Sequence, residues 1–311
     1  MARVGRGWAA VGDGVKSGSG VEKAGTVVEG AALAPPHRDE RLTVIRPSSR
    51  WPRLDLLEIW RFRELFLTLV WRDIAVRYKQ TAIGAAWAIL QPVMLMIVMT
   101  LVFGKFAKFD SEGFPYPIFN YSGLLPWLFF AGALTLTSGS VLTNRNLVTK
   151  VYFPRIILPA AGVLVPLVDM VLASSVLVGM MFWFGVFPGA AIVFAPLFLV
   201  LALLTAFGVG LWFAALGVRY RDVPLIVPFV IQLWFWLSAV AYSPRSLADA
   251  YQWIFALNPM NGVIQGFRWS FLDTPAPGLG QLALSAGAAI VLVVTGAAFF
   301  RASESGFADT I

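Results

Sequence analysis

Long apolar stretches separated by short charged segments dominate the pattern of hydrophobic and polar positions along this chain. Five stretches contain at most one charged residue: residues 80–104, 113–144, 156–218, 223–244 and 274–300. The third is the longest, and a turn-like sequence at residues 185–189 divides it in two. A helix needs about 20 apolar residues to cross the hydrocarbon core of a bilayer. The pattern therefore predicts an integral membrane protein.

Six membrane-spanning helices fit these stretches, at residues 83–104, 120–142, 156–184, 191–217, 223–243 and 281–300. The predicted fold class is all-α, because a membrane β-barrel would show short segments of alternating polarity instead of long apolar blocks. Small residues at Gly208, Gly210 and Ala214 would allow helices to approach one another closely.

Composition agrees with a membrane domain and narrows its chemistry. Hydrophobic residues make up 58% of the chain and charged residues 13%, against roughly 45–50% and 25% in soluble domains. The chain has no cysteine, and its only histidine is His37. We therefore expect no metal site and no cofactor bound by this chain. No nucleotide-binding motif is visible, so the chain is predicted not to be an enzyme, and any use of ATP requires another polypeptide.

The net charge of +7 mainly reflects topology. Fourteen of the 24 Lys and Arg residues precede residue 80, and most of the others fall on the same side of the predicted membrane. The positive-inside rule then places both termini in the cytoplasm. We divide the chain into a disordered cytoplasmic leader at 1–42, an amphipathic region at 43–80, a six-span domain at 81–301 and a short cytoplasmic tail at 302–311.

The amphipathic region is predicted to contain a helix, because apolar residues recur there at helical spacing. Its candidate interface residues are Phe62, Leu65, Phe66 and Leu69. One interpretation is a helix that lies on the inner leaflet with its arginines near lipid headgroups. The other is a docking element for a cytoplasmic partner, and the two are compatible.

Two connections between spans have unusual composition. Residues 144–155 form a short basic inside loop with room for one or two helical turns, and its apolar residues 151–154 are typical of an interaction site. The outside connection at 244–280 is long, and the pair Asn258 and Pro259 divides it into two helix-like pieces at 246–257 and 260–272. Either a re-entrant hairpin or an interfacial helical pair fits this pattern.

Asp169 is the one ionisable residue deep inside a predicted span. An intramembrane carboxylate is costly and often functional, for example in a proton relay. The alternative is a protonated or hydrogen-bonded aspartate that positions its helix against a neighbour. We favour this structural role, because the spans contain no Lys, His or second acid to complete a relay.

Aromatic residues are abundant near the predicted span ends and in the outside connection. They could form the aromatic belt at the membrane interface, or they could stack against sugar rings along a transport pathway. The candidate pathway and gate residues are Trp127, Phe130, Trp234, Trp236, Tyr242, Asn258, Pro259, Phe267 and Arg268. Sequence position does not separate the two interpretations.

Several ordered segments resemble one known family. They are WRDIAVRYKQT (71–81), GLLPW (123–127), NLVTKVYFPR (146–155), VRYRDV (218–223), LNPM (257–260) and GFR (266–268). Over residues 43–272 the chain resembles the membrane subunit of ABC-2 type exporters, in the branch that exports O-antigen, capsule and teichoic acid. The chain departs from the family pattern at Ala239, where we expect proline, and residues 1–42 have no recognised counterpart.

The resemblance implies a homodimer of six-span subunits in the bacterial inner membrane, paired with two copies of an ATPase that binds ATP and Mg. It implies that residues 146–155 form the coupling helix that seats in the ATPase. The candidate coupling residues are Asn146, Leu147, Lys150, Tyr152, Phe153 and Arg155. It also implies an interface helix at 51–70, an outer gate at 244–272 and a lipid-linked glycan substrate.

Our hypothesis from the sequence is therefore the permease subunit of an ATP-driven exporter of a lipid-linked polysaccharide such as O-antigen. One competing hypothesis is an ABC-2 exporter of a small hydrophobic drug or lipid. A second is a proton-coupled secondary transporter that uses Asp169. A third, a membrane-bound glycosyltransferase, requires an acidic or metal motif at the inner face, and the sequence has none.

Overall fold

The computed structural model describes residues 60–79, 85–220, 222–244, 249–304 and 306–307. Every regular element in these ranges is a helix, in agreement with the predicted all-α class. The predicted leader at residues 1–42 lies outside the described residues.

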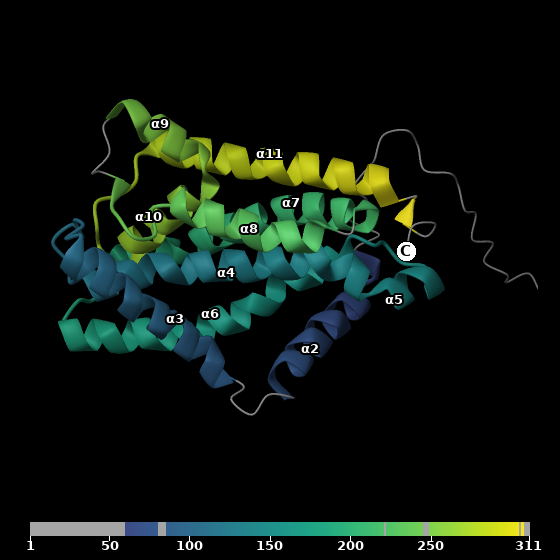
Figure 1. Ribbon diagram of the computed structural model, residues 1–311, viewed down its shortest axis with the longest axis horizontal. Coiled ribbons are helices and arrows are strands. Elements are labelled where there is room, and N and C mark those ends of the chain that lie inside the picture. Colours follow the sequence, from purple (N-terminus) through teal and green to yellow (C-terminus); the bar gives the residue numbers. More distant parts are fainter. Residues whose placement is uncertain (1–59, 80–84, 221, 245–248, 305, 308–311) are drawn as a thin grey trace, which may run out of the picture. The chain divides into compact units, whose positions relative to one another are not determined.

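Five helical stretches in the described part of the chain are long and apolar enough to cross a membrane (Figure 1). They are α3 Ala85–Met99 with its π-helical extension Thr100–Phe106, α4 Tyr116–Thr143, α6 Ile157–Phe184, α7 Ala195–Arg219 with the preceding 3-10 turn Ala190–Phe194, and α11 Leu279–Glu304. They coincide with five of the six predicted spans.

The remaining predicted span, at 223–243, is a shorter helix followed by irregular backbone. Helix α8 covers Val223–Trp236, only 14 residues, which at 1.5 Å per residue gives about 21 Å, less than the roughly 30 Å of a bilayer core. Residues 237–244 continue without regular helix. By length and composition, the structure thus contains five candidate spans in its described part.

Side chains from α4 and α10 satisfy the backbone of this irregular segment. Asn261 Oδ1 accepts from the amide of Ala239 at 2.8 Å, and the Tyr116 hydroxyl donates to the carbonyl of Ala241 at 2.6 Å. Arg268 donates to the carbonyls of Val240 and Tyr242. Irregular backbone in an apolar environment requires such partners. Proline has no amide hydrogen, so alanine at position 239 makes the bond to Asn261 possible.

Two helices follow, and they match the predicted pieces at 246–257 and 260–272. Helix α9 covers Asp249–Leu257 and α10 covers Pro259–Leu272. Asn258 caps α10, since its Oδ1 accepts from the amide of Met260 at 3.1 Å, and Pro259 occupies the first helical position. α10 packs against α4, α7 and α11, and most of its side chains are buried.

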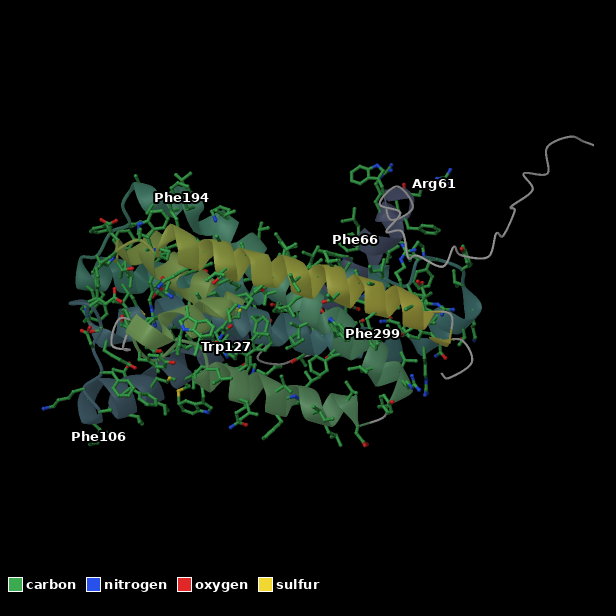
Figure 2. The ribbon with its side chains drawn as sticks, turned by 90° about the horizontal axis from the view of Figure 1, so that it is seen from above. Arg61, Phe66, Phe106, Trp127, Phe194 and Phe299 are labelled. Atoms are coloured by element: carbon green, nitrogen blue, oxygen red, sulfur yellow. The ribbon has the colours of Figure 1, made fainter. Side chains whose placement is uncertain are left out.

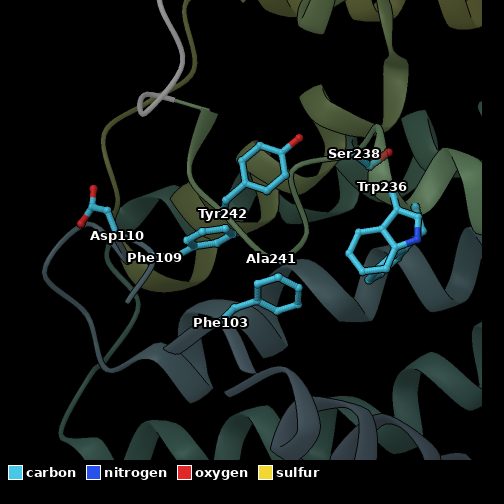
Figure 3. Close-up of a pocket in the computed structure, with 8 residues that line it drawn as sticks. Phe103, Phe109, Asp110, Trp236, Ser238, Ala241 and Tyr242 are labelled. Atoms are coloured by element: carbon cyan, nitrogen blue, oxygen red, sulfur yellow. The ribbon is translucent and has the colours of Figure 1, made fainter. Parts of the chain in front are cut away.

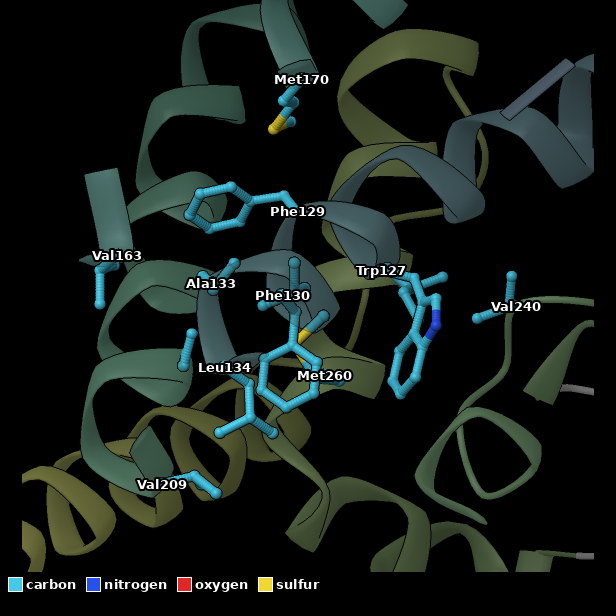
Figure 4. Packing of buried hydrophobic residues seen from close by; sticks show 14 of the residues in the cluster. Trp127, Phe129, Phe130, Ala133, Leu134, Val163, Met170, Val209, Val240 and Met260 are labelled. Atoms are coloured by element: carbon cyan, nitrogen blue, oxygen red, sulfur yellow. The ribbon is translucent and has the colours of Figure 1, made fainter. Parts of the chain in front are cut away.

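The main hydrophobic core surrounds α4, which packs against α6, α7 and α10 (Figure 4). Trp127, Phe130 and Leu134 of α4 meet Met260 of α10 and Val209 of α7 in this core. α4 is the most buried of the five long helices, with 67% of its apolar window inside the subunit. It is therefore held by protein on most of its surface.

Glycines let α7 approach both of its main neighbours, as the sequence predicts for Gly208 and Gly210. A Cβ on Gly208 would lie 2.6 Å from the amide nitrogen of Val293 in α11, and a Cβ on Gly210 would lie 2.7 Å from Thr137 Cβ in α4. Real Cβ atoms do not tolerate such distances. The two contacts thus depend on the absence of a side chain.

Helix α2 (Arg63–Lys79) and the short helix α5 (Arg145–Lys150) complete the described fold. α5 lies at the same end of the bundle as the carboxyl end of α11, and α9 lies at the opposite end (Figure 1). We refer to these as the α5 end and the α9 end. α2 packs against α6.

Candidate functional site

The segment that follows α4 presents side chains in two directions. Asn146, Lys150 and Tyr152 are exposed, and Tyr152 is 81% exposed. Phe153 is only 4% exposed, and Leu147 is half-buried. The backbone changes from helix to extended at Val151. Successive side chains point to opposite sides of an extended backbone, which fits an exposed Tyr152 next to a buried Phe153. One part of the segment therefore anchors it while another part is free to contact a partner.

A second hydrophobic cluster, which we call the α5-end cluster, receives Phe153. It joins α2, the end of α4, α5, the start of α6, the end of α7 and the end of α11. Its buried members are Leu69, Val141, Val148, Phe153, Ile156, Ile157, Leu158, Ala161, Leu211, Ala214, Ala215, Val218, Ala297, Phe300 and Phe307. Six helices thus contribute to one apolar core at this end.

The predicted interface residues of α2 pack onto this cluster. Leu69 is 4% exposed, while Phe62, Leu65 and Phe66 are half-buried against the cluster; Figure 2 labels Phe66 on this helix. Trp60, Leu67 and Trp71 instead remain 60–69% exposed. Within α2, at 100° per residue, Leu67 and Trp71 lie on the opposite side of the helix from Leu65, Phe66 and Leu69. The set predicted from periodicity therefore faces the subunit, and a second apolar set faces outward.

Asp169 of α6 contacts the carboxyl end of α2. A guanidinium nitrogen of Arg77 lies 2.6 Å from Asp169 Oδ2, and the Tyr78 hydroxyl donates to Asp169 Oδ1. Burial, reinforced by the Asp169 carboxylate, raises the pKa of Tyr78, so the phenol stays protonated at physiological pH. Asp169 thus has an opposite charge outside its own span.

Sequence reasoning did not identify Arg77 and Tyr78 as the partners of Asp169. The available signal was their place in the segment WRDIAVRYKQT, which carries part of the family resemblance. The pairing is the arrangement that a structural role for Asp169 requires, because it holds α6 against α2. The structural role of Asp169 stays a prediction, and a proton relay stays the alternative hypothesis.

A cavity of about 810 Å³ lies beside this ion pair. Arg77, Tyr78, Gln91, Thr135 and Asp169 supply its polar lining. Apolar side chains supply the rest, among them Trp87, Leu128, Phe129, Met170 and Ile231. The cavity is therefore mainly apolar, with its charged groups contributed by α2 and α6.

A smaller cavity of about 430 Å³ lies at the α9 end (Figure 3). Its walls are aromatic, from Phe103, Phe109, Trp236 and Tyr242, and Asp110 contributes the one carboxylate. Two of the predicted pathway residues, Trp236 and Tyr242, thus lie on the same cavity. Trp236 is 55% exposed.

Most of the other predicted pathway residues are buried in the subunit, whereas Trp234 and Asn258 are half-buried. Trp127, Phe130 and Phe267 are at most 3% exposed and belong to the main core. Trp234 Nε1 donates to Asn258 Oδ1 at 2.9 Å, and Pro259 is buried. In this conformation Trp127, Phe130 and Phe267 are enclosed by protein, whereas Trp236 and Tyr242 line the smaller cavity.

Arg268 is buried in the described structure, 2% exposed, and its side chain bonds to three backbone carbonyls. It donates to the carbonyls of Phe119, Val240 and Tyr242 at 3.3, 2.7 and 3.1 Å, and its guanidinium lies 3.7 Å from the Phe119 ring centroid. These contacts join α10, α4 and the irregular segment 237–244. The side chain therefore fixes the α9 end and does not line an open path here.

The described ranges contain no group of three or more His, Asp or Glu side chains placed to hold a metal ion. What the geometry offers is a helical membrane bundle with two cavities and an exposed tip at its α5 end. These features define a helical membrane protein with several candidate spans. Comparison with known proteins supplies its family and the transport class.

Residues 64–272 match the family model described as ABC-2 type transporter. This match spans more than half of the chain, and the chain belongs to the ABC-2 type transporter family.

The relatives of this chain include proteins named for polysaccharide export. The O-antigen export system permease protein RfbA of Myxococcus xanthus is 28% identical over 82% of this chain and 98% of its own length. RfbA of Klebsiella pneumoniae is 24% identical over 80% of this chain and 95% of its own length. The polysialic acid transport protein KpsM of Escherichia coli is 23% identical over 75% of this chain and 91% of its own length.

Proposed function

We propose that this chain is the membrane subunit of an ATP-driven exporter that moves a lipid-linked polysaccharide, such as O-antigen, across the bacterial inner membrane. The observation that carries the proposal is the family match together with relatives that cover four fifths of the chain and are named for O-antigen export. The polysialic acid transport protein KpsM supports the same substrate class.

In this proposal ATP and Mg bind to a separate ATPase, present in two copies beside a homodimer of this chain. The exposed Tyr152 beside the buried Phe153 supports a contact of this kind, because it offers an aromatic side chain on a fixed base. Asn146 and Lys150 are exposed on the same segment. ATP binding would close the partner dimer, and the segment 146–155 would carry that motion into the bundle.

The proposed topology has six spans with both termini in the cytoplasm. Helix α8 together with residues 237–244 would serve as the fifth span, and the partners supplied to this segment support its placement at membrane depth. Arg145, Lys150 and Arg301 lie at the α5 end, as the positive-inside rule requires for a cytoplasmic face. α2 would be the cytoplasmic interface helix, and α9 with α10 the outer re-entrant pair.

The ion pair between Arg77 and Asp169 supports ATP-driven transport over proton coupling. The Asp169 carboxylate is held by the Arg77 guanidinium at 2.6 Å and by the Tyr78 hydroxyl, and such a fixed contact between two helices suits a positioning role. Asp169 is expected to position α6 against α2 in this proposal.

Disruption of the gene, followed by fractionation of glycolipid between cytoplasm and cell surface, tests the substrate class. Lipid-linked polymer trapped inside, with none at the surface, and restoration by the wild-type gene support the proposal. An unchanged surface glycan with altered tolerance to hydrophobic drugs would instead identify a small-molecule exporter. Loss of transport on collapse of the proton gradient at constant ATP would identify a secondary transporter.

A further inference from the structure

Arg155, the last residue of the proposed coupling segment, contacts the chain's own carboxyl-terminal residues. Its backbone amide donates to Glu304 Oε1 at 3.1 Å, and its Nη1 donates to the Glu304 backbone carbonyl. Backbone and side chain of each residue thus bond to the other residue, which fixes the distance and the register between the two segments.

An aromatic pair closes this contact on its apolar side. The Arg155 guanidinium lies 5.8 Å from the Phe307 ring centroid. The Phe307 ring in turn packs edge-on against Phe300 of α11, with centroids 5.3 Å apart and planes at 76°. Phe307 is 2% exposed, so this residue beyond the end of α11 is part of the α5-end cluster.

These contacts give the segment 146–155 a direct attachment to the last long helix. Tyr152 is free for a partner, Phe153 enters the α5-end cluster, and Arg155 is held by Glu304 and Phe307. α11 itself runs along α7, where a Cβ on Gly208 would collide with the α11 backbone. A displacement at Tyr152 can therefore reach α11 through direct contacts of Arg155, in addition to any route through α4, whose Val141 belongs to the same cluster.

We propose that Arg155, Glu304 and Phe307 form a clamp that fastens the coupling segment to α11, and that Arg155 acts as a positioning residue within the subunit. This inference rests on the proposed function, because it assigns a path for the motion that an ATPase delivers. Arg155 then has a different task from Tyr152, although the two are only three residues apart.

The test uses the full-length chain co-assembled with its ATPase in lipid vesicles, with Arg155→Ala and Phe307→Ala as variants. Each is expected to lower glycan export per ATP hydrolysed about fivefold or more, because a net loss of one or two such contacts changes an equilibrium by about that factor. ATP hydrolysis should persist. Glu304→Gln keeps an oxygen that can accept from the Arg155 amide and should retain most export.

Arg219→Ala is the matched control, because Arg219 is an exposed arginine at the same end with no part in the clamp. Phe307→Leu is a second variant that keeps apolar volume, so a folding defect is separated from loss of the ring contact. Normal coupling in Arg155→Ala and Phe307→Ala would overturn the proposal.

A second readout is independent of the substrate. The chain has no cysteine, so spin labels placed by Thr149→Cys and Ala302→Cys, both exposed positions, report the distance between α5 and the end of α11. The wild-type distribution should be narrow, and Arg155→Ala should broaden it. An unchanged distribution with lost ATPase stimulation would place Arg155 on the partner and overturn the clamp. A broadened distribution in a complex that exports no glycan would retain the clamp and refute the proposed substrate.

Discussion

Replacement of Gly208 by alanine tests whether α7 and α11 are in contact through their backbones. The added Cβ would lie 2.6 Å from the Val293 nitrogen, 2.7 Å from the Leu292 carbonyl carbon and 3.0 Å from the Leu292 oxygen. Ordinary contact begins at 3.4 Å, so the closest approach is 0.8 Å too short. All three atoms belong to the backbone, and no side chain can rotate away to relieve the overlap.

The helices must therefore separate, and that loosens their other contacts, including the stack of Trp212 on Phe299 at 4.4 Å between centroids. Overpacking of this kind costs about 1–3 kcal/mol. It outweighs the gain of up to about 1 kcal/mol that alanine brings over glycine inside a helix. We expect Gly208→Ala to lower the midpoint of thermal unfolding of the purified, detergent-solubilised subunit.

Gly287→Ala in α11 is the matched control, because no described atom lies within 4 Å of a Cβ built at that position. It should leave the midpoint unchanged or raise it, since only the helix propensity differs. Equal midpoints for the two variants would refute the close approach of α7 and α11. A higher midpoint for Gly208→Ala would refute it as well.

Four further substitutions follow from the placement of single side chains. Tyr152→Ala should lower export without changing the unfolding midpoint, because its ring is 81% exposed. Phe153→Ala should lower the midpoint, because loss of a buried ring lowers the free energy of unfolding by about 3–5 kcal/mol. Thermal scans and export assays on both variants check this. Asp169→Asn should lower the free energy of unfolding by only about 1 kcal/mol, because the Arg77 partner is 44% exposed. Export by this variant should stay independent of the proton gradient, and a loss of export confined to energised vesicles would establish a relay. Arg268→Met should lower the free energy of unfolding by at least about 3 kcal/mol, since three carbonyls lose a donor. Amide hydrogen exchange should rise at residues 237–244, and unchanged exchange would contradict the role of Arg268 in holding this segment.

The sequence predicted the membrane class and five of the long helices because the cost of placing a segment in a bilayer depends on its own composition. Charge-free length fixes where α3, α4, α6, α7 and α11 begin and end to within a few residues. The division of 244–280 at Asn258 and Pro259 was equally local, since a capping side chain and a proline act on the helix that they start.

The partners and exposures of individual side chains depended on the tertiary structure. Helix α8 ends at Trp236, short of the predicted span. Beyond it, side chains of α4 and α10 form hydrogen bonds with the backbone of residues 237–244, so this segment needs no helix to satisfy its polar groups. Arg77 pairs with Asp169, which is far away in the sequence. Phe153 is buried, whereas its neighbour Tyr152 is exposed.

The aromatic residues show the difference between what the sequence determines and what the tertiary structure decides. In the sequence, nothing distinguishes Trp127, Phe130 and Phe267 from Trp236. In the structure the first three are buried in the core, and Trp236 lies on a cavity. Hydropathy is summed along a chain and identifies what enters the membrane. Which face of a helix meets protein, and which meets a ligand, is set by contacts between segments distant in sequence, and only the packed structure brings those segments together.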